Sequence, residues 1–346
     1  MQGKDQKLPK VLETQFEPIA EDELHKFVSK SLRYSHHRAS IESIERRILK
    51  RRMDWRGARL FERLKVRLSN GMSLYLFLKC FRPHFDSGPS SPNTGSDREA
   101  DVYRILLKGT TLGTAQYYGI HNINRYGEVL LLLEFVQGKK LNKIKDQKTW
   151  LAVAKWLAHI HHHFSKRLND LYQIKSLYRH DSTFFWNWAY LAAESASSVS
   201  PKVRKIMARI LMQYEKVAAP LSNAPSTLLH GEFYCTNIFI RHEEQRRFIC
   251  AFDWETAAIG CAALDLTHLL RQRFGISSVS LVDSYLEGWN ELGGAPFSST
   301  QLWQYIRRFK VHELMYFIWS DVNHKRTSAE RILIYAKRAE QYMDSF

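Results

Sequence analysis

The stretch Leu228–Ile240 reads LLHGEFYCTNIFI, and the motif FDWE follows it, with Asp253 placed 16 residues after Asn237. The first stretch carries a carboxylate, Glu232, and an amide, Asn237, between two apolar runs. Three side-chain oxygen donors are thus placed next to predicted strand ends, where they can converge on one small space. Mg²⁺ prefers hard oxygen ligands and is usually bound by one or two carboxylates together with substrate phosphates. The two motifs therefore predict a magnesium–phosphate site.

The residues around these motifs predict a β-hairpin. Ile238–Ile240 is apolar, and a further apolar run, Phe248–Phe252, leads into Asp253. Two short apolar runs separated by the polar segment His242–Arg247 are typical of buried strands joined by a turn.

The pattern HGE-x4-N followed by DWE resembles the catalytic core of the aminoglycoside phosphotransferase and choline kinase-like small-molecule kinases, which have the protein-kinase fold. The usual family form is HGD-x4-N, so this chain resembles an HGE variant. The resemblance implies that Glu232 is the catalytic base, that His230 orients the loop, and that Asn237 and Asp253 hold Mg²⁺. It also implies a structural role for Asp265, which bonds backbone near the catalytic loop.

The N-terminal third of the chain predicts a small antiparallel sheet. Residues 1–40 are polar with scattered apolar positions, which favours a helical extension. The segments Ile44–Lys50, Leu60–Leu68 and Leu74–Phe81 are strand-like. Ser69-Asn70-Gly71 between the last two predicts a hairpin turn, because Asn-Gly readily adopts the positive φ values that such turns need.

Lys79 lies inside an otherwise apolar predicted strand, SLYLFLKCF. Burial of a lysine is costly unless its charge is paired. The family resemblance implies that Lys79 binds the α- and β-phosphates of a nucleotide and pairs with Glu99 of the segment READVYRILL. In the alternative interpretation, Lys79 extends to solvent from a strand edge and Glu99 is a charge at a helix N-terminus.

The run VLLLLEFVQGKKL predicts a buried strand that ends near Glu134, and it resembles the family hinge, whose backbone binds adenine at Glu134 and Val136. We place the lobe boundary at Gly138, which gives an N-terminal lobe of residues 1–138 and a C-terminal lobe of residues 139–346.

The stretch that matches the phosphate loop, Arg51–Ala58, holds a single glycine and is a weak signal for a phosphate-binding loop. Asp86–Arg98 is rich in Gly, Pro and Ser and predicts a loop.

The C-terminal region predicts helices. Trp150–Phe164 is amphipathic, and its His159 and His163 have the i,i+4 spacing of a helical zinc pair, although a helix surface resembling the family pattern LA-x-LH is favoured. The aromatic segments Phe184–Tyr190 and Trp303–Trp319 are predicted to lie mostly in the core. Some of these rings could line an acceptor pocket, since such pockets are mostly apolar and aromatic.

The composition of the chain limits the classes of molecule that it is expected to bind. The chain has 346 residues, 45% of them hydrophobic, and a net charge of +16. Lys30–Asn70 holds 13 Lys or Arg against four Asp or Glu, a basic region that attracts anions or is simply solvated. We expect no specific nucleic-acid partner, because no recognisable binding module is present. The four cysteines form no CxxC pair, no signal peptide is evident and no stretch approaches the length of a membrane span, so we expect a cytoplasmic protein.

The residue patterns predict a small N-terminal antiparallel sheet lobe and a larger, mainly helical C-terminal lobe, and the family resemblance implies that they form an α+β, two-lobed protein-kinase-like fold. The resemblance implies an ATP- and Mg²⁺-dependent phosphotransferase that acts on a hydroxyl of a small molecule. The strongly basic chain favours a neutral or anionic acceptor, such as a metabolite, a sugar or an antibiotic-like compound. The alternative is a kinase-like binding protein that transfers no phosphate, and a nucleic-acid-associated protein is supported by charge alone.

Overall fold

The computed structural model describes residues 18–34, 39–54, 57–83, 96–110, 112–123, 128–243, 246–271, 275–324 and 327–346. The chain forms two compact units. The sheet unit comprises Met1–Gly138 and Phe239–Glu255, and the helical unit comprises Lys139–Ile238 and Thr256–Phe346. Of the described helices, none is long and apolar enough to cross a membrane.

The sheet unit is built on a five-stranded antiparallel sheet with the order β1-β2-β3-β5-β4. Its strands are β1 (Ile41–Asp54), β2 (Gly57–Leu68), β3 (Ser73–Pro83), β4 (Tyr117–Ile123) and β5 (Glu128–Glu134). The apolar positions of β2, β3 and β5 are buried in one core, which includes Leu64, Val66 and Leu78. The predicted antiparallel sheet is thereby confirmed.

The β2–β3 hairpin forms where Ser69-Asn70-Gly71 predicted it, with Val66 opposite Leu74 and Arg67 opposite Ser73. Gly71 has a φ of +81°, and its amide donates to the carbonyl of Leu68. Positive φ has little steric cost for glycine, which explains why the chain reverses at this residue. In the predicted phosphate loop, residues 55–56 lie outside the described part of the chain.

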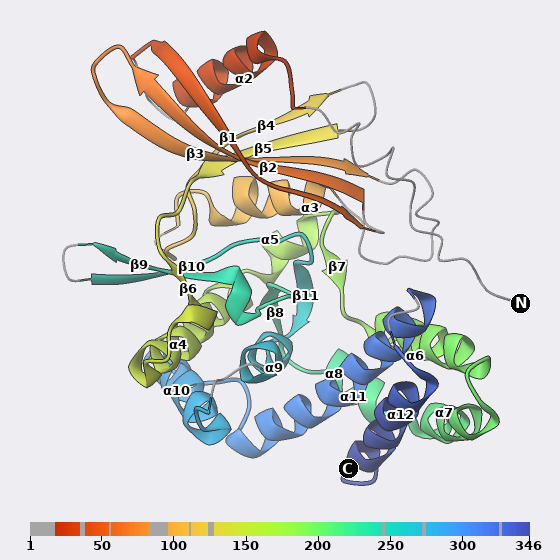
Figure 1. Cartoon of the computed structure of the whole chain (residues 1–346). Coiled ribbons are helices and arrows are strands. Elements are labelled where there is room, and N and C mark those ends of the chain that lie inside the picture. The colour runs from red at the N-terminus through yellow and green to blue at the C-terminus, as the bar shows by residue number, and fades with distance from the viewer. Residues whose placement is uncertain are drawn as a thin grey trace, which may run out of the picture. The chain divides into compact units, whose positions relative to one another are not determined.

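Helix α2 (Glu21–Tyr34) packs against β4 (Figure 1). It places Leu24, Phe27 and Val28 in the core of the sheet unit. The predicted N-terminal helix therefore forms over these residues, while residues 1–17 and 35–38 are outside the described part.

Helix α3 (Ser96–Asp101) continues into a π-helix, Val102–Leu107, whose buried residues include Val102 and Tyr103. The predicted Gly/Pro/Ser-rich loop ends earlier than expected, because Ser96–Arg98 belong to α3; residues 84–95 are not described. The predicted second hairpin is also present as β9 (Ile238–Glu243) and β10 (Arg246–Ala251), two neighbouring strands. These strands are longer than predicted and take up part of the expected turn.

The helical unit contains most of the helices. They are α4 (Gln147–Ser165), α5 (Leu168–Gln173), α6 (Ser182–Ser197), α7 (Pro201–Gln213), α8 (Glu215–Ser222), α9 (Ala263–Arg271), α10 (Ser278–Asn290), α11 (Ser299–Asn323) and α12 (Ala329–Met343), with a 3-10 turn at Leu141–Lys143. Short strands β7 (Tyr178–Arg179), β8 (Ser226–Leu229) and β11 (Ala258–Cys261) form a small sheet, and β6 spans Lys139–Lys140. Helix α4 packs on α10, and α11 lies beside α6 and α12 (Figure 1).

The prediction that the aromatic segments of α6 and α11 lie in the core is confirmed for Phe185, Trp188 and Phe309, which are buried between these helices. The Phe185 ring packs at a tilt against Phe309, and Trp188 makes edge contacts with Tyr316 and Trp319. Most other rings of the two segments are only partly buried, and the side chain of Tyr190 is exposed.

Two buried histidines of the helical unit should make stability depend on pH. Burial lowers the pKa of His312 to about 3 and that of His268 to about 4, below the ordinary value of 6.5. As pH falls, the unfolded chain therefore binds protons before the folded protein does. We expect the free energy of unfolding to be highest above about pH 6.5 and to fall by about 1 kcal/mol per histidine by about pH 5.5.

Urea unfolding of the wild type and His312→Gln at a series of pH values checks this expectation. The variant lacks one titrating group, so its free energy of unfolding should depend less steeply on pH than that of the wild type. Identical slopes in the two proteins would show that His312 does not contribute.

Candidate active site

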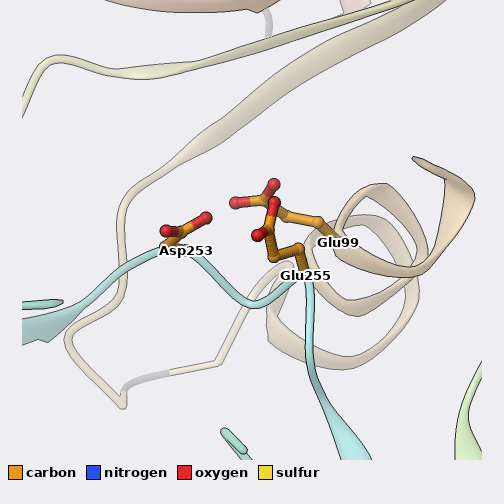
Figure 2. A group of neighbouring side chains, drawn as sticks. All are labelled: Glu99, Asp253 and Glu255. Atoms are coloured by element: carbon orange, nitrogen blue, oxygen red, sulfur yellow. The ribbon is translucent and has the colours of Figure 1, made fainter. Parts of the chain in front are cut away.

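Lys79 of β3 lies at the centre of the sheet unit's polar cluster, and its side chain is only 6% exposed. Its Nζ donates to Glu99 Oε2 at 2.5 Å and to Asp253 Oδ1 at 2.8 Å, and it lies 3.3 Å from Glu255 Oε2. Figure 2 shows the three carboxylates converging, Glu99 from α3 and the other two from the segment after β10. We call Glu99, Asp253 and Glu255 the carboxylate cluster.

The charges of this group balance only in part. Burial alone would lower the pKa of Lys79, but Asp253, Glu99 and Glu255 together raise it well above its usual value. Lys79 is therefore a permanent cation, paired as a buried lysine must be. Burial raises the pKa of Glu99 to about 7, although the charge of Lys79 opposes this shift.

Two arginines brace Glu255 from neighbouring elements. Arg59 of β2 donates through Nη2 to Glu255 Oε1 at 3.2 Å, and Arg98 of α3 donates to the Glu255 carbonyl at 2.7 Å. The Glu255 side chain points toward Lys79, while its backbone carbonyl is held by Arg98. Neither arginine was singled out from the sequence, because nothing in a single charged residue reveals a partner far away along the chain.

Asp253 has a backbone conformation that is unusual for a residue with a side chain. Its φ is +70°, the left-handed region, and it is the one such residue other than glycine in the described part of the chain. Strained backbone of this kind persists where the surrounding structure enforces it and is common at functional sites. Its carboxylate is also the most exposed of the cluster.

The carboxylate cluster has the donor chemistry of a divalent cation site. One carboxylate oxygen from each of Glu99, Asp253 and Glu255 lies within 4.8 Å of the others. All the donors are hard oxygens, which suit Mg²⁺. The helix-surface interpretation of His159 and His163 was favoured over a zinc pair, and the two rings contact other side chains: His159 Nε2 lies 3.4 Å from Glu291 Oε2, and His163 Nε2 lies 3.3 Å from Arg167 Nη1.

The predicted hinge begins at Glu134, the last residue of strand β5. The Glu134 carboxylate pairs with Arg241 and accepts the Gln116 amide at 3.1 Å, and the Phe135 amide donates to the Tyr75 carbonyl. These contacts hold the chain where the strand ends. The adenine-binding roles of Glu134 and Val136 remain predictions.

The helical unit holds His230–Asn237, which we call the HGE loop. Gly231 has a φ of +82°, and a Cβ there would lie 2.2 Å from the Thr256 carbonyl, so the loop requires glycine at this position. The Glu232 carbonyl accepts from the Tyr234 amide at 2.7 Å and from Asn237 Nδ2 at 3.1 Å. The Glu232 amide in turn donates to His230 Nδ1 at 3.3 Å. The backbone at Glu232 is thus held from three sides.

Asp265 anchors the start of the HGE loop. Its carboxylate accepts the His230 amide at 2.7 Å and the Gly231 amide at 2.9 Å, and His161 Nε2 lies 3.2 Å away. Burial disfavours the ionised form, but the hydrogen bond and charge of His161, with contributions from His230, lower the pKa of Asp265 below its usual range. Asp265 is therefore an ionised carboxylate that holds the loop through two backbone amides.

His161 was missed by sequence reasoning, which assigned the histidines of α4 to a helix surface. It is fully buried, and its Nδ1 lies 2.8 Å from the hydroxyl of Tyr285 on α10. Its place on the apolar face of α4, beside Ile160 and Phe164, was the available signal for burial. Its partners come from α9 and α10, so no local pattern could have identified them.

Asp265→Asn should loosen this anchor. The amide oxygen of asparagine can still accept one backbone hydrogen bond, but its Nδ2 group would face the other backbone N–H donor. We therefore expect the free energy of unfolding to fall by about 2–4 kcal/mol. Tyr285→Phe removes a contact further from the loop and should cost about 1 kcal/mol. Chemical denaturation measures both, and equal losses would show that Asp265 does not have the anchoring role.

The structure therefore groups the predicted site residues into two sets. Lys79, Glu99 and Asp253 contact one another in the sheet unit. His230 and Asn237 each bond the backbone of Glu232 in the HGE loop of the helical unit. Cys235, also in this loop, is buried, and burial raises the pKa of its thiol, which fits a filler of the loop rather than a reactive cysteine.

Comparison with known proteins defines the class. The model of the phosphotransferase enzyme family matches residues 89–301. The solved structure of spectinomycin phosphotransferase in complex with ADP and spectinomycin is similar, with a TM-score of 0.56, 12% identity, and coverage of 95% of this chain and 99% of that one. No curated protein matches the sequence.

Two further structures are similar. The GDP complex of wild-type aminoglycoside 2'-phosphotransferase-IIIa has a TM-score of 0.55, 13% identity, and coverage of 91% of this chain and 99% of that one. An ethanolamine kinase from Plasmodium vivax has a TM-score of 0.52, 16% identity, and coverage of 88% and 83%.

The fold is thus the kinase-like α+β fold of small-molecule phosphotransferases, as the sequence predicted. The chain belongs to the phosphotransferase enzyme family.

Proposed function

We propose that this protein transfers the γ-phosphoryl group of ATP to a hydroxyl group of a small molecule, with Mg²⁺ as the cofactor. The observation that carries the proposal is the buried Lys79 held by Glu99 next to Asp253 and Glu255. A fixed cation beside converging carboxylates can bind phosphate oxygens through Lys79 and a divalent cation through the carboxylates. Nucleotides in two of the similar structures, as ADP and GDP complexes, support nucleotide use.

Each residue has a proposed role. Lys79, oriented by Glu99, contacts the α- and β-phosphates. Asp253 and Asn237 are the proposed Mg²⁺ ligands, and the Glu255 carboxylate lies beside Asp253 in the carboxylate cluster. When bound, Mg²⁺ would neutralise phosphate charge. Glu134 and Val136 supply backbone groups for the base of the nucleotide.

Glu232 is the proposed base. In the reaction the hydroxyl oxygen of the acceptor forms a bond to the γ-phosphorus, and the bond between that phosphorus and the bridging oxygen breaks. ADP leaves with the electron pair of that bond, and Glu232 accepts the hydroxyl proton. His230 and Asp265 hold the loop so that Glu232 is aligned for this step. We also propose a cytoplasmic location, which the four buried cysteines and the lack of a CxxC pair in the sequence favour.

Asp253→Asn tests the metal assignment. The substitution replaces a charged oxygen ligand by a neutral amide, and we expect the affinity for Mg·ATP to fall at least about 10-fold. ATP affinity without Mg²⁺ should change little. Asp101→Asn is a matched control on α3, because Asp101 pairs with Arg104 at the surface. If calorimetry finds an unchanged Mg·ATP affinity in Asp253→Asn, Asp253 is not a ligand of the metal.

Phosphoryl transfer itself is tested with wild-type protein, Mg·ATP and a panel of hydroxylated compounds, by detecting phosphorylated products. Transfer to any acceptor hydroxyl supports the proposal. Tight Mg·ATP binding with no transfer would instead identify a kinase-like binding protein.

A further inference from the structure

A pocket of about 350 Å³ lies within the helical unit, among α9, α11 and α12. Its wall combines basic and aromatic side chains. The cations are Arg271, Lys310, Arg331 and Arg338. The rings are Trp303, Phe317, Tyr335 and Tyr342. The predicted aromatic segment Trp303–Trp319 therefore contributes two rings to this wall.

The lining carries an excess of positive charge. Four cations face one carboxylate, Glu313, and Arg271 donates to that carboxylate at 3.1 Å. Burial raises the pKa of Glu313, an effect that the charges of Arg271 and Lys310 oppose. Lys310, Arg331 and Arg338 add positive charge to that of the Arg271–Glu313 pair. This excess gives the pocket a positive potential that attracts anions and repels amines.

Three of the four cations contact aromatic side chains. The Arg271 guanidinium lies 4.4 Å from the centre of the Phe317 ring, and Lys310 Nζ lies 5.6 Å from that of Tyr342. Arg331 Nε donates to the Tyr335 hydroxyl at 2.9 Å. Such contacts keep the charge and restrict the side chains of Arg271, Lys310 and Arg331.

The pocket adjoins the HGE loop. The Arg271 guanidinium also lies over the ring of Tyr234, 5.9 Å from its centre, and Tyr234 stands two residues after Glu232. The Tyr234 ring packs against His268, which precedes Arg271 on α9, with ring centres 4.6 Å apart. One arginine thus contacts both the pocket wall and the loop that carries the proposed base.

We propose that this pocket binds the acceptor through an anionic group, such as a carboxylate, beside an apolar or flat part of the molecule. This inference rests on the proposed function, because it names the substrate class of that same site. Guanidinium groups bind carboxylates through charge-assisted, often bidentate hydrogen bonds, while the rings contact the carbon skeleton. A cationic amino alcohol or aminoglycoside would instead meet like charge in this pocket.

The test uses three acceptors that share one skeleton and one hydroxyl. They are 3-phenyllactate, which is anionic, its neutral amide, and the cationic 1-amino-3-phenylpropan-2-ol. Binding to the full-length protein is measured by calorimetry in the presence of Mg²⁺ and a non-hydrolysable ATP analogue. Transfer is measured with Mg·ATP by mass spectrometry of the products. We expect phenyllactate to be favoured over the amine at least about 10-fold in both measurements.

Charge variants locate the preference in the pocket. Arg338→Gln and Lys310→Gln should each reduce the preference for phenyllactate over the amine several-fold. The matched controls are Lys337→Gln, next to Arg338 on α12, and Arg307→Gln, one turn before Lys310 on α11; both are exposed and outside the pocket lining. The controls should retain the wild-type preference.

The outcomes separate this inference from the proposed function. If Mg·ATP fails to bind, the proposed function fails. If Mg·ATP binds but phenyllactate has no advantage over the amide and the amine in either measurement, the inference is wrong while the kinase assignment stands. The inference is also overturned if the advantage exists but survives both Arg338→Gln and Lys310→Gln unchanged.

Discussion

Replacement of Lys79 by methionine should lower kcat/KM by at least about 10²–10³-fold, the effect of removing a fixed charge from a phosphoryl-transfer site. Methionine matches the length of the lysine stem but cannot contact phosphate. The same change leaves three neighbouring carboxylates without their shared cation, and the Lys79 and Glu99 side chains are buried. We therefore also expect the free energy of unfolding to fall by about 3–5 kcal/mol.

A second variant separates these two effects. Lys79→Arg keeps the charge, so it should recover part of the stability while its different head group still impairs catalysis. Lys65→Met is the control, because Lys65 is a partly exposed lysine of the same sheet that pairs with Glu45. Steady-state kinetics and urea unfolding provide the measurements. Normal turnover of Lys79→Met with an identified acceptor would show that Lys79 does not bind the nucleotide.

Glu232→Gln should reduce phosphoryl transfer by about 10²-fold or more, as expected for a general base, while Mg·ATP binding persists. The side chain keeps its size but loses its ability to accept the hydroxyl proton. Glu232→Asp keeps the charge and loses reach, so it should be partly active. The unperturbed pKa values of the two acids differ little, about 4.3 against about 3.9, so position rather than basicity decides the difference.

The structure explains why position is critical at Glu232. Its backbone is held by His230, Tyr234 and Asn237, so the loop itself cannot readily shift to compensate for a shorter side chain. Single-turnover measurements with Mg·ATP compare the chemical step directly. If Glu232→Gln changes neither transfer nor any slow ATP hydrolysis, another group takes the proton and the assignment of the base is wrong.

Local sequence patterns were sufficient to predict the main elements of the fold. The alternation of apolar residues and the Asn-Gly pair specify the β2–β3 hairpin through neighbouring residues alone. The apolar run of β5 is buried, as its composition predicted. The motif spacing of the HGE loop and FDWE also indicated the enzyme family, because it preserves the order of several polar and apolar positions.

Contacts between distant parts of the chain were decided by tertiary structure. A lone acid such as Glu255 or Asp265 has several possible partners in the sequence, and only the packing of α3, β2 and α4 selects Arg98, Arg59 and His161. The strained backbone of Asp253 and the basic wall of the pocket around Arg271 likewise arise from residues far apart in the chain. Charge pairing and burial depend on three-dimensional neighbours, which composition and periodicity do not specify.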